Sequence, residues 1–293
     1  MKKAGFTQAW LPILLLVPQL SIILIFFYWP AAQAVQSSFY LQDPFGFGST
    51  FVGADNYTDL LGNAEYKRIA WFTVIFTVSV TFLSLSLALL LAVKADKVIR
   101  GAKGYRTLLM WVYAVAPPVA GFIGLIMFNQ SWGPITRTFA ALGHDLKIGV
   151  NYWDTAGAMI AVSVWKQIPV NFIFFLSGLQ SIPRSVREAA LIDNRSASSR
   201  FWGVTFPLLA PTGFFLLIIN ITYALFDTFG VIDTLVKGEP GNNPMTLVYK
   251  VFVDGFRGND LGGSSAQSVI LMVLVLALTV FQFRMVERRI HYT

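Results

Sequence analysis

Several polar side chains lie inside long apolar stretches of this sequence, where each could bind a charged or polar ligand. Lys166 and Asn171 fall in one such stretch, and Asn220, Tyr223 and Asp227 fall in another. A charged or amide group in apolar surroundings is costly unless protein, water or ligand pairs with it. These five residues are therefore candidates for a polar binding path.

Lys166 has the most specific chemistry of the five. Its ammonium group could hold an anionic substrate, and Gln167 and Asn171 lie one helical turn apart beside it. Alternatively, Lys166 is a structural residue that bonds to kinked backbone near Pro169 or pairs with Asp227. The sequence leaves both interpretations open.

The other three polar residues have helical spacing. Asn220, Tyr223 and Asp227 are separated by three and four positions, which predicts one polar face along a helix. Such a stripe could line a translocation path. Hydrogen bonding between helices is an equally good interpretation.

A second candidate site lies in the polar segment between these two apolar stretches. Ser185 and Glu188 have the spacing of a capping box, which predicts a short helix starting at Ser185. Ala189 and Ala190 would give that helix a small, flat surface for a protein partner. Asn194 can adopt the left-handed conformation that ends a helix. The segment is therefore predicted to form a helix–turn–helix elbow.

Common catalytic and metal-binding patterns are absent from the sequence. There is no Cys, and the two His residues, His144 and His291, are far apart. No phosphate-binding loop of the G-x-x-x-x-G-K-[ST] type occurs, and no H-E-x-x-H or G-x-S-x-G motif occurs. We therefore expect no enzymatic activity, no metal and no cofactor in this chain.

Long apolar segments must position these residues. The chain is 55% apolar and only 13% charged, about half the usual charged share. Six segments have the length of a bilayer crossing, about 20 residues, and they are residues 10–29, 69–93, 107–128, 156–179, 207–232 and 266–286. Their apolar residues do not alternate as in a β-barrel strand. The sequence predicts an all-α polytopic membrane protein with six transmembrane helices in a single domain, residues 1–293, with kinks at prolines inside the segments, which are Pro18, Pro117, Pro118, Pro169 and Pro211.

The first segment could also be a signal peptide. Lys2 and Lys3 precede it, and residues 32–34 look like a cleavage site. Its apolar stretch exceeds the 7–15 residues typical of a signal peptide, so we expect a retained helix.

The distribution of basic residues predicts the orientation. The N-terminus, residues 94–106, residues 181–206 and the C-terminal tail hold 14 Lys and Arg, whereas the opposite loops hold 7. The positive-inside rule places the first set, and both termini, in the cytoplasm. The basic run at 94–106 is then a turn near anionic lipid rather than a nucleic-acid site.

The polar segment resembles the EAA loop of bacterial ABC importer permeases. That loop reads Glu-Ala-Ala, then Asp-Gly, then Leu-Pro further on. The matching residues here are Glu188, Ala189, Ala190, Asp193 and Pro207. Asn194 replaces the usual Gly, and Phe206 replaces the usual Leu. Asn also tolerates the left-handed conformation, so we expect the turn to persist.

The resemblance extends along nearly the whole chain. Further matching segments are residues 43–47, 51–53, 56–57, 113–117, 164–167, 223–229 and 265–268. They are similar to the maltose-type carbohydrate-uptake family of ABC permeases, in particular to its members for sn-glycerol-3-phosphate. The resemblance implies a type I ABC importer permease fold in the bacterial inner membrane. It also implies sn-glycerol-3-phosphate or a related glycerophospho compound as the substrate.

The same resemblance implies a mechanism and partners. The loop with Glu188, Ala189, Ala190, Asp193 and Asn194 would form a coupling helix that docks on a separate ATPase homodimer, which would bind ATP and Mg. A second, homologous permease and a periplasmic substrate-binding protein would complete the importer. Three alternatives remain at this point: an importer for a neutral sugar or oligosaccharide, an ion-coupled secondary transporter, and a membrane scaffold that transports nothing.

Overall fold

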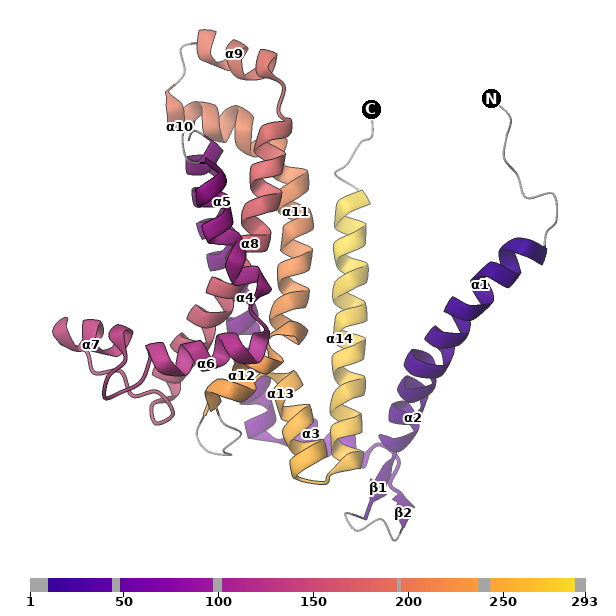
Figure 1. Ribbon diagram of the computed structural model, residues 1–293. Coiled ribbons are helices and arrows are strands. Elements are labelled where there is room, and N and C mark those ends of the chain that lie inside the picture. Colours follow the sequence, from indigo (N-terminus) through magenta and orange to yellow (C-terminus); the bar gives the residue numbers. More distant parts are fainter. Residues whose placement is uncertain (1–9, 44–47, 97–101, 194–195, 237–242, 288–293) are drawn as a thin grey trace. The chain divides into compact units, whose positions relative to one another are not determined.

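The computed structural model describes residues 10–43, 48–96, 102–193, 196–236 and 243–287, and these are almost entirely helical (Figure 1). The chain forms two compact units. Unit 1 comprises residues 1–64 and 250–275, and unit 2 comprises residues 65–249 and 276–293. The all-α prediction is confirmed for the described residues, whereas the single domain over 1–293 stays a prediction.

Within the described residues, five helices are long and apolar enough to cross a membrane. They are Ile13–Ser37, Ala64–Asp96, Tyr152–Ser181, Ala197–Asp227 and Leu261–Gln282. A sixth crossing is present if the bent pair Arg106–Ala114 and Pro117–Met127 counts as one span. The predicted count of six is therefore reached only with a broken span.

The predicted helix over 107–128 is not continuous. The helix axis bends by 108° between its two halves. Ala116 is extended, and Pro117 and Pro118 open the second half. A residue before proline avoids the helical conformation, and proline has no N–H to donate to the preceding turn. The two prolines therefore break this span rather than kink it.

The start of the fifth span was also predicted wrongly. Helix begins at Ala197, ten residues before the predicted Pro207. A π-helical turn over Phe201–Thr205 leads into the next helix, and the N–H of Phe206 bonds to the carbonyl of Phe201. This wider turn accommodates Pro207, which cannot donate a hydrogen bond. Pro18, Pro169 and Pro211 lie inside helices, as predicted.

Unit 1 combines helices with one small hairpin. Its elements are α1 (Trp10–Ile23), η1 (Leu24–Tyr28), α2 (Trp29–Ser37), β1 (Tyr40–Gln42), β2 (Ser49–Phe51), α3 (Asp55–Gly62), η5 (Val253–Arg257), the end of α13 (Leu247–Phe252) and the first part of α14 (Leu261–Glu287). The strands are antiparallel, with Tyr40 opposite Phe51. The Asn56 amide donates to the carbonyls of Ser38 and Tyr40 at 2.8 and 3.2 Å, which ties α3 to the start of the hairpin.

Unit 2 contains the candidate site residues. Its elements are α4 (Ala64–Asp96), α5 (Ala102–Met110), η2 (Trp111–Ala114), α6 (Pro117–Met127), α7 (Pro134–Ala141), α8 (Tyr152–Ser181), α9 (Arg184–Ile192), α10 (Ala197–Arg200), η3 (Phe201–Thr205), α11 (Phe206–Thr222), η4 (Tyr223–Asp227), α12 (Phe229–Val236), most of α13 (Leu247–Phe252) and the end of α14. Figure 1 shows α9 and α7 at opposite ends of this unit.

The core of unit 2 is built from α4, α8 and α11. Ala88 and Ala92 of α4, Phe172 of α8, and Leu209 and Leu216 of α11 form one fully buried cluster. Small residues on α4 let the three helices approach closely, which is how membrane helices gain packing energy.

Small residues also join α6 to α12. A Cβ atom on Gly121 would lie 2.7 Å from the Thr234 Cβ, and one on Gly230 would lie 3.0 Å from the Pro118 ring. The second half of the broken span is therefore held against α12 by contacts that only glycine permits.

Candidate functional site

The short helix expected between the fourth and fifth spans is α9. It begins at Arg184, directly after Pro183, whose carbonyl accepts the N–H groups of Val186 and Arg187. No side chain caps this end, so the predicted capping box of Ser185 and Glu188 is wrong. The fixed φ of Pro183 (−56°, with ψ 141°) suits the position before a helix. The helix therefore starts at Arg184, one residue before the predicted start at Ser185.

The two faces of α9 differ in exposure. Glu188 and Ala189 are exposed, as are Leu191 and Ile192, the last with 82% of its surface accessible. Ala190 is buried. The prediction of two alanines on one outward surface is therefore wrong, because residues adjacent in a helix point about 100° apart.

The predicted end of this helix is only partly described. Asp193 lies directly after α9, and its N–H bonds to the carbonyl of Ala189 at 3.1 Å. Asn194, expected in the left-handed turn, lies outside the described residues.

Arg187 connects α9 to two spans. Its Nη1 lies 3.2 Å from Oδ2 of Asp96, the last residue of α4. Its Nη2 donates to the carbonyl oxygen of Leu179, in the last turn of α8. Nothing in the sequence near Arg187 predicts this contact, because Asp96 is 91 positions away.

A cavity of about 470 Å³ lies beneath α9. Ala190 and Leu191 line it from α9, Leu179 from α8, and Phe201 and Val204 from η3. The inner face of α9 is therefore only partly packed against the spans.

The amides of Asn171 and Asn220 face each other in the core. Each donates from Nδ2 to the other's Oδ1, at 2.9 and 2.7 Å, and both side chains are fully buried. Ser84 Oγ of α4 donates to the same Asn220 oxygen at 2.8 Å. This is the hydrogen bonding between helices that the sequence analysis gave as the alternative to a substrate path.

Lys166, Tyr223 and Asp227 lie near one another. Tyr223 is buried and donates to the carbonyl of Ser163 at 3.2 Å. Lys166 is 9% exposed, and the Asp227 carboxyl lies within electrostatic range of it. No ion pair or hydrogen bond of the Lys166 ammonium group occurs among the residues that the structure describes.

The predicted common face of Asn220, Tyr223 and Asp227 is only partly present. Asn220 and Tyr223 both contact α8, but Asp227 is exposed. The helix changes to π geometry over Tyr223–Asp227, and this changes the angle between successive residues.

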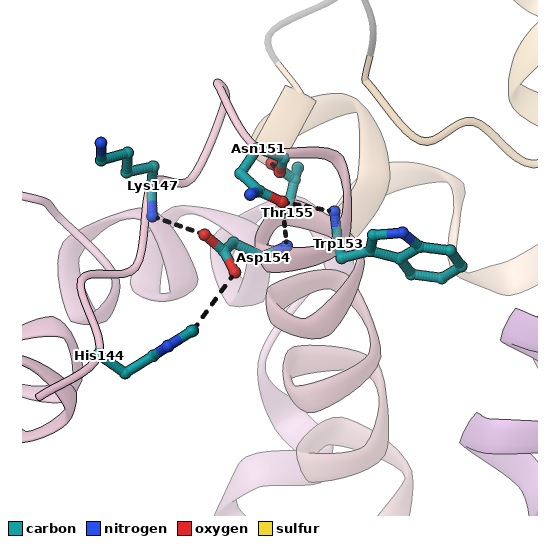
Figure 2. A network of polar contacts seen from close by, with 6 residues as sticks. All are labelled: His144, Lys147, Asn151, Trp153, Asp154 and Thr155. Atoms are coloured by element: carbon teal, nitrogen blue, oxygen red, sulfur yellow. Dashed lines mark hydrogen bonds and ion pairs between the residues drawn. The ribbon is translucent and has the colours of Figure 1, made fainter. Parts of the chain in front are cut away.

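A polar network holds the opposite end of α8 (Figure 2). The Asn151 carboxamide accepts the N–H groups of Trp153 and Asp154, at 3.0 and 3.3 Å, and caps the helix. Asp154 accepts the backbone N–H of Lys147 at 2.9 Å and lies 3.9 Å from His144 Nε2. The sequence analysis missed this cap, although Asn directly before a helical pattern is its usual signal.

No metal site is evident in the described part of the chain, where no three His, Cys, Asp or Glu side chains gather. What the site offers is an exposed, anchored helix at one end of the spans and a small polar group within them.

Comparison with known proteins gives consistent results. Residues 85–292 match the family described as "Binding-protein-dependent transport system inner membrane component". The chain is 50% identical to the sn-glycerol-3-phosphate transport system permease protein UgpA of Brucella suis biovar 1 (strain 1330), with all of both chains covered. Identity and coverage are the same for the protein of that name from Rhizobium meliloti (strain 1021). For the Salmonella typhi protein identity is 46%, over 98% of this chain and 97% of the relative.

Two solved structures share the fold. One is a bacterial ABC transporter involved in the import of the acidic polysaccharide alginate, with a TM-score of 0.83 and 20% identity over 96% of both chains. The other is the alginate transporter in complex with an alginate pentasaccharide-bound periplasmic protein, with a TM-score of 0.78 and 18% identity over 95% of this chain and 94% of that chain.

Proposed function

The chain belongs to the family of binding-protein-dependent transport system inner membrane components, and on this premise we propose that it is the permease subunit of an ATP-driven importer for sn-glycerol-3-phosphate. The observation that supports this substrate is the 50% identity, over the full length of both chains, to permeases named for that compound. The chain is an inner-membrane component without catalytic activity, and ATP binds to a partner ATPase.

The second part of the proposal is that α9 is the coupling helix. Glu188, Ala189, Leu191 and Ile192 form an exposed surface of one acidic, one small and two apolar side chains. A partner groove would bury the apolar pair and position the acid, as expected of a docking contact. Ala190 and Arg187 face the spans instead and hold the helix from behind.

The orientation in the membrane and the partners are part of the same proposal. From the basic loops we infer that α9 and both termini lie in the cytoplasm, where the ATPase homodimer would bind. A periplasmic binding protein delivers substrate to the opposite face, and a second, homologous permease completes the path.

Within the spans, the substrate path includes Lys166, Tyr223 and Asp227. A phosphate group passing the Lys166 ammonium would gain a charge-assisted contact in a region of low dielectric constant. Asp227 is exposed on the single chain and lies at the edge of this group. Asn171 and Asn220 hold the helices behind the path, because each amide bonds to the other.

The test is uptake of labelled sn-glycerol-3-phosphate by cells deleted for this chain, with and without its restoration. We expect uptake to be lost on deletion, restored by the wild-type chain, abolished by ATP depletion and insensitive to uncouplers. Uptake that collapses with uncouplers but survives ATP depletion would identify an ion-coupled transporter. Restoration of neutral-sugar uptake alone would assign the importer to the sugar class.

A further inference from the structure

The helix α9 is linked to α8 and to α10 through the chain itself, but its link to α4 is a side-chain contact. Residues 182–183 lead from α8 into α9, and the segment after Asp193 leads into α10. The contact with α4 is the ion pair between Arg187 Nη1 and Asp96 Oδ2, at 3.2 Å. A pull on α9 therefore reaches α8 and α11 through backbone, and reaches α4 through Arg187.

The guanidinium of Arg187 suits this role because it is planar and has several N–H groups in a fixed arrangement. One nitrogen faces the Asp96 carboxylate, and another donates to the carbonyl oxygen of Leu179. A single rigid group thus holds the ends of α4 and α8 together and fixes α9 against both.

Packing alone does not hold α9 in this position. The cavity beneath α9 separates part of its inner face from η3, and Ala190 has too small a side chain to fill it. Where apolar contact is incomplete, a directional polar contact determines more of the geometry.

We propose that Arg187 is a positioning residue that transfers movement of α9 to α4, so that three spans rather than two respond to the ATPase. This inference rests on the proposed function of α9 as the coupling helix. Arg187 is 40% exposed and Asp96 is 18% exposed. A partly solvated pair of this kind contributes little to folding, so its removal leaves an assembled importer in which coupling can be measured.

The experiment uses the complete importer in proteoliposomes, with its ATPase, second permease and binding protein. The measurement is the number of labelled sn-glycerol-3-phosphate molecules taken up per ATP hydrolysed. Asp96→Asn removes the charge from the link to α4 and keeps the Arg187 bond to Leu179, whereas Arg187→Gln weakens both. Lys94→Gln is the matched control, since it removes an exposed charge from the same end of α4 that forms no contact in the described structure.

We expect Asp96→Asn and Arg187→Gln each to lower uptake per ATP about fivefold or more, the lower end of typical coupling effects, and Lys94→Gln to leave it unchanged. The exchanged pair, Arg187→Asp with Asp96→Arg, restores the ion pair between α9 and α4 without the bond to Leu179, so it should recover part of the uptake per ATP, which a loss of packing could not explain. A wild-type ratio in the assembled Asp96→Asn importer would overturn the inference and leave the proposed function standing. An equal loss in Lys94→Gln would also overturn it. A wild-type importer without ATP-dependent uptake of this substrate would overturn the proposed function and the inference together.

Discussion

Asn171 of α8 and Asn220 of α11 exchange two amide hydrogen bonds in the centre of unit 2, at 2.9 and 2.7 Å. The Asn220 Nδ2 also donates to the carbonyl of Leu216 at 2.7 Å, and Ser84 Oγ donates to the Asn220 oxygen. Both amides are thus satisfied within the protein, which a segment surrounded by lipid requires. The pair fixes the axial position of α8 against α11, since a shift of either helix would break both bonds.

Replacing Asn220 by Ala should destabilise the protein. The change leaves the Asn171 amide buried without its partner, at a cost of about 1–3 kcal/mol. Thermal unfolding of the purified protein in detergent would measure this. Replacing both Asn171 and Asn220 by Leu should cost less than the sum of the two single replacements by Leu. The double variant buries no unpaired amide, whereas each single variant buries one. Additive effects would contradict the pairing.

Glu188→Lys should abolish uptake without loss of membrane insertion. The Glu188 side chain is exposed on α9, so the change disturbs the proposed contact with the ATPase rather than the fold. The measurement combines substrate uptake with the amount of the chain in the membrane. Ser185→Lys, also on an exposed position of α9, is the control for added positive charge. Normal uptake by the Glu188 variant would remove α9 from the coupling mechanism.

Lys166→Met should weaken transport of a phosphate-bearing substrate. We expect the substrate concentration for half-maximal uptake to rise about tenfold, equivalent to the loss of one contact of about 1.4 kcal/mol. Lys166→Arg keeps the charge and should retain most activity. Lys147→Met, at an exposed position before α8, is the matched control. An unchanged value for Lys166→Met would place the substrate path elsewhere.

Gly121→Val should loosen the contact between α6 and α12. Even a Cβ would lie 2.7 Å from the Thr234 Cβ and 2.9 Å from the Val231 carbonyl, so the larger side chain must push the helices apart. Overpacking of this kind costs about 1–3 kcal/mol. Gly213→Ala is the control, because the nearest atom to its Cβ would be Phe175 Cε1 at 3.9 Å. Equal melting temperatures for the two variants would contradict close packing at Gly121.

The spans could be predicted from sequence because their signal is local. Length and apolar composition predicted α4 and α8 closely, since both are continuous helices. The broken third span was missed because consecutive prolines inside a span can kink or break it, and neighbouring helices decide which. The early start at Ala197 was missed because a π turn absorbs Pro207, and no simple spacing predicts such a turn.

The sequence predicted which polar residues lie in the candidate site, but not which of them contact one another. The sequence identified Asn171 and Asn220 as polar positions within spans. Whether such amides contact a ligand or each other depends on how their two helices pack, and the two residues lie 49 positions apart in the sequence. Arg187 and Asp96 illustrate the same limit, because neither residue is unusual in its own segment.

The Arg187–Asp96 contact also has a topological consequence. Asp96 ends α4, and Arg187 follows the end of α8, so these two helices end on the same side of the membrane. The 30 residues of α8 extend for about 45 Å, more than a hydrocarbon core of about 30 Å, so α8 begins on the other side. The chain between Asp96 and Tyr152 must therefore cross the bilayer an odd number of times. In that stretch the bent pair is the apolar candidate for this crossing within the described residues. Counted with the five long apolar helices of the described residues, this crossing would bring the number to six, so a contact between two side chains bears on the topology of the spans.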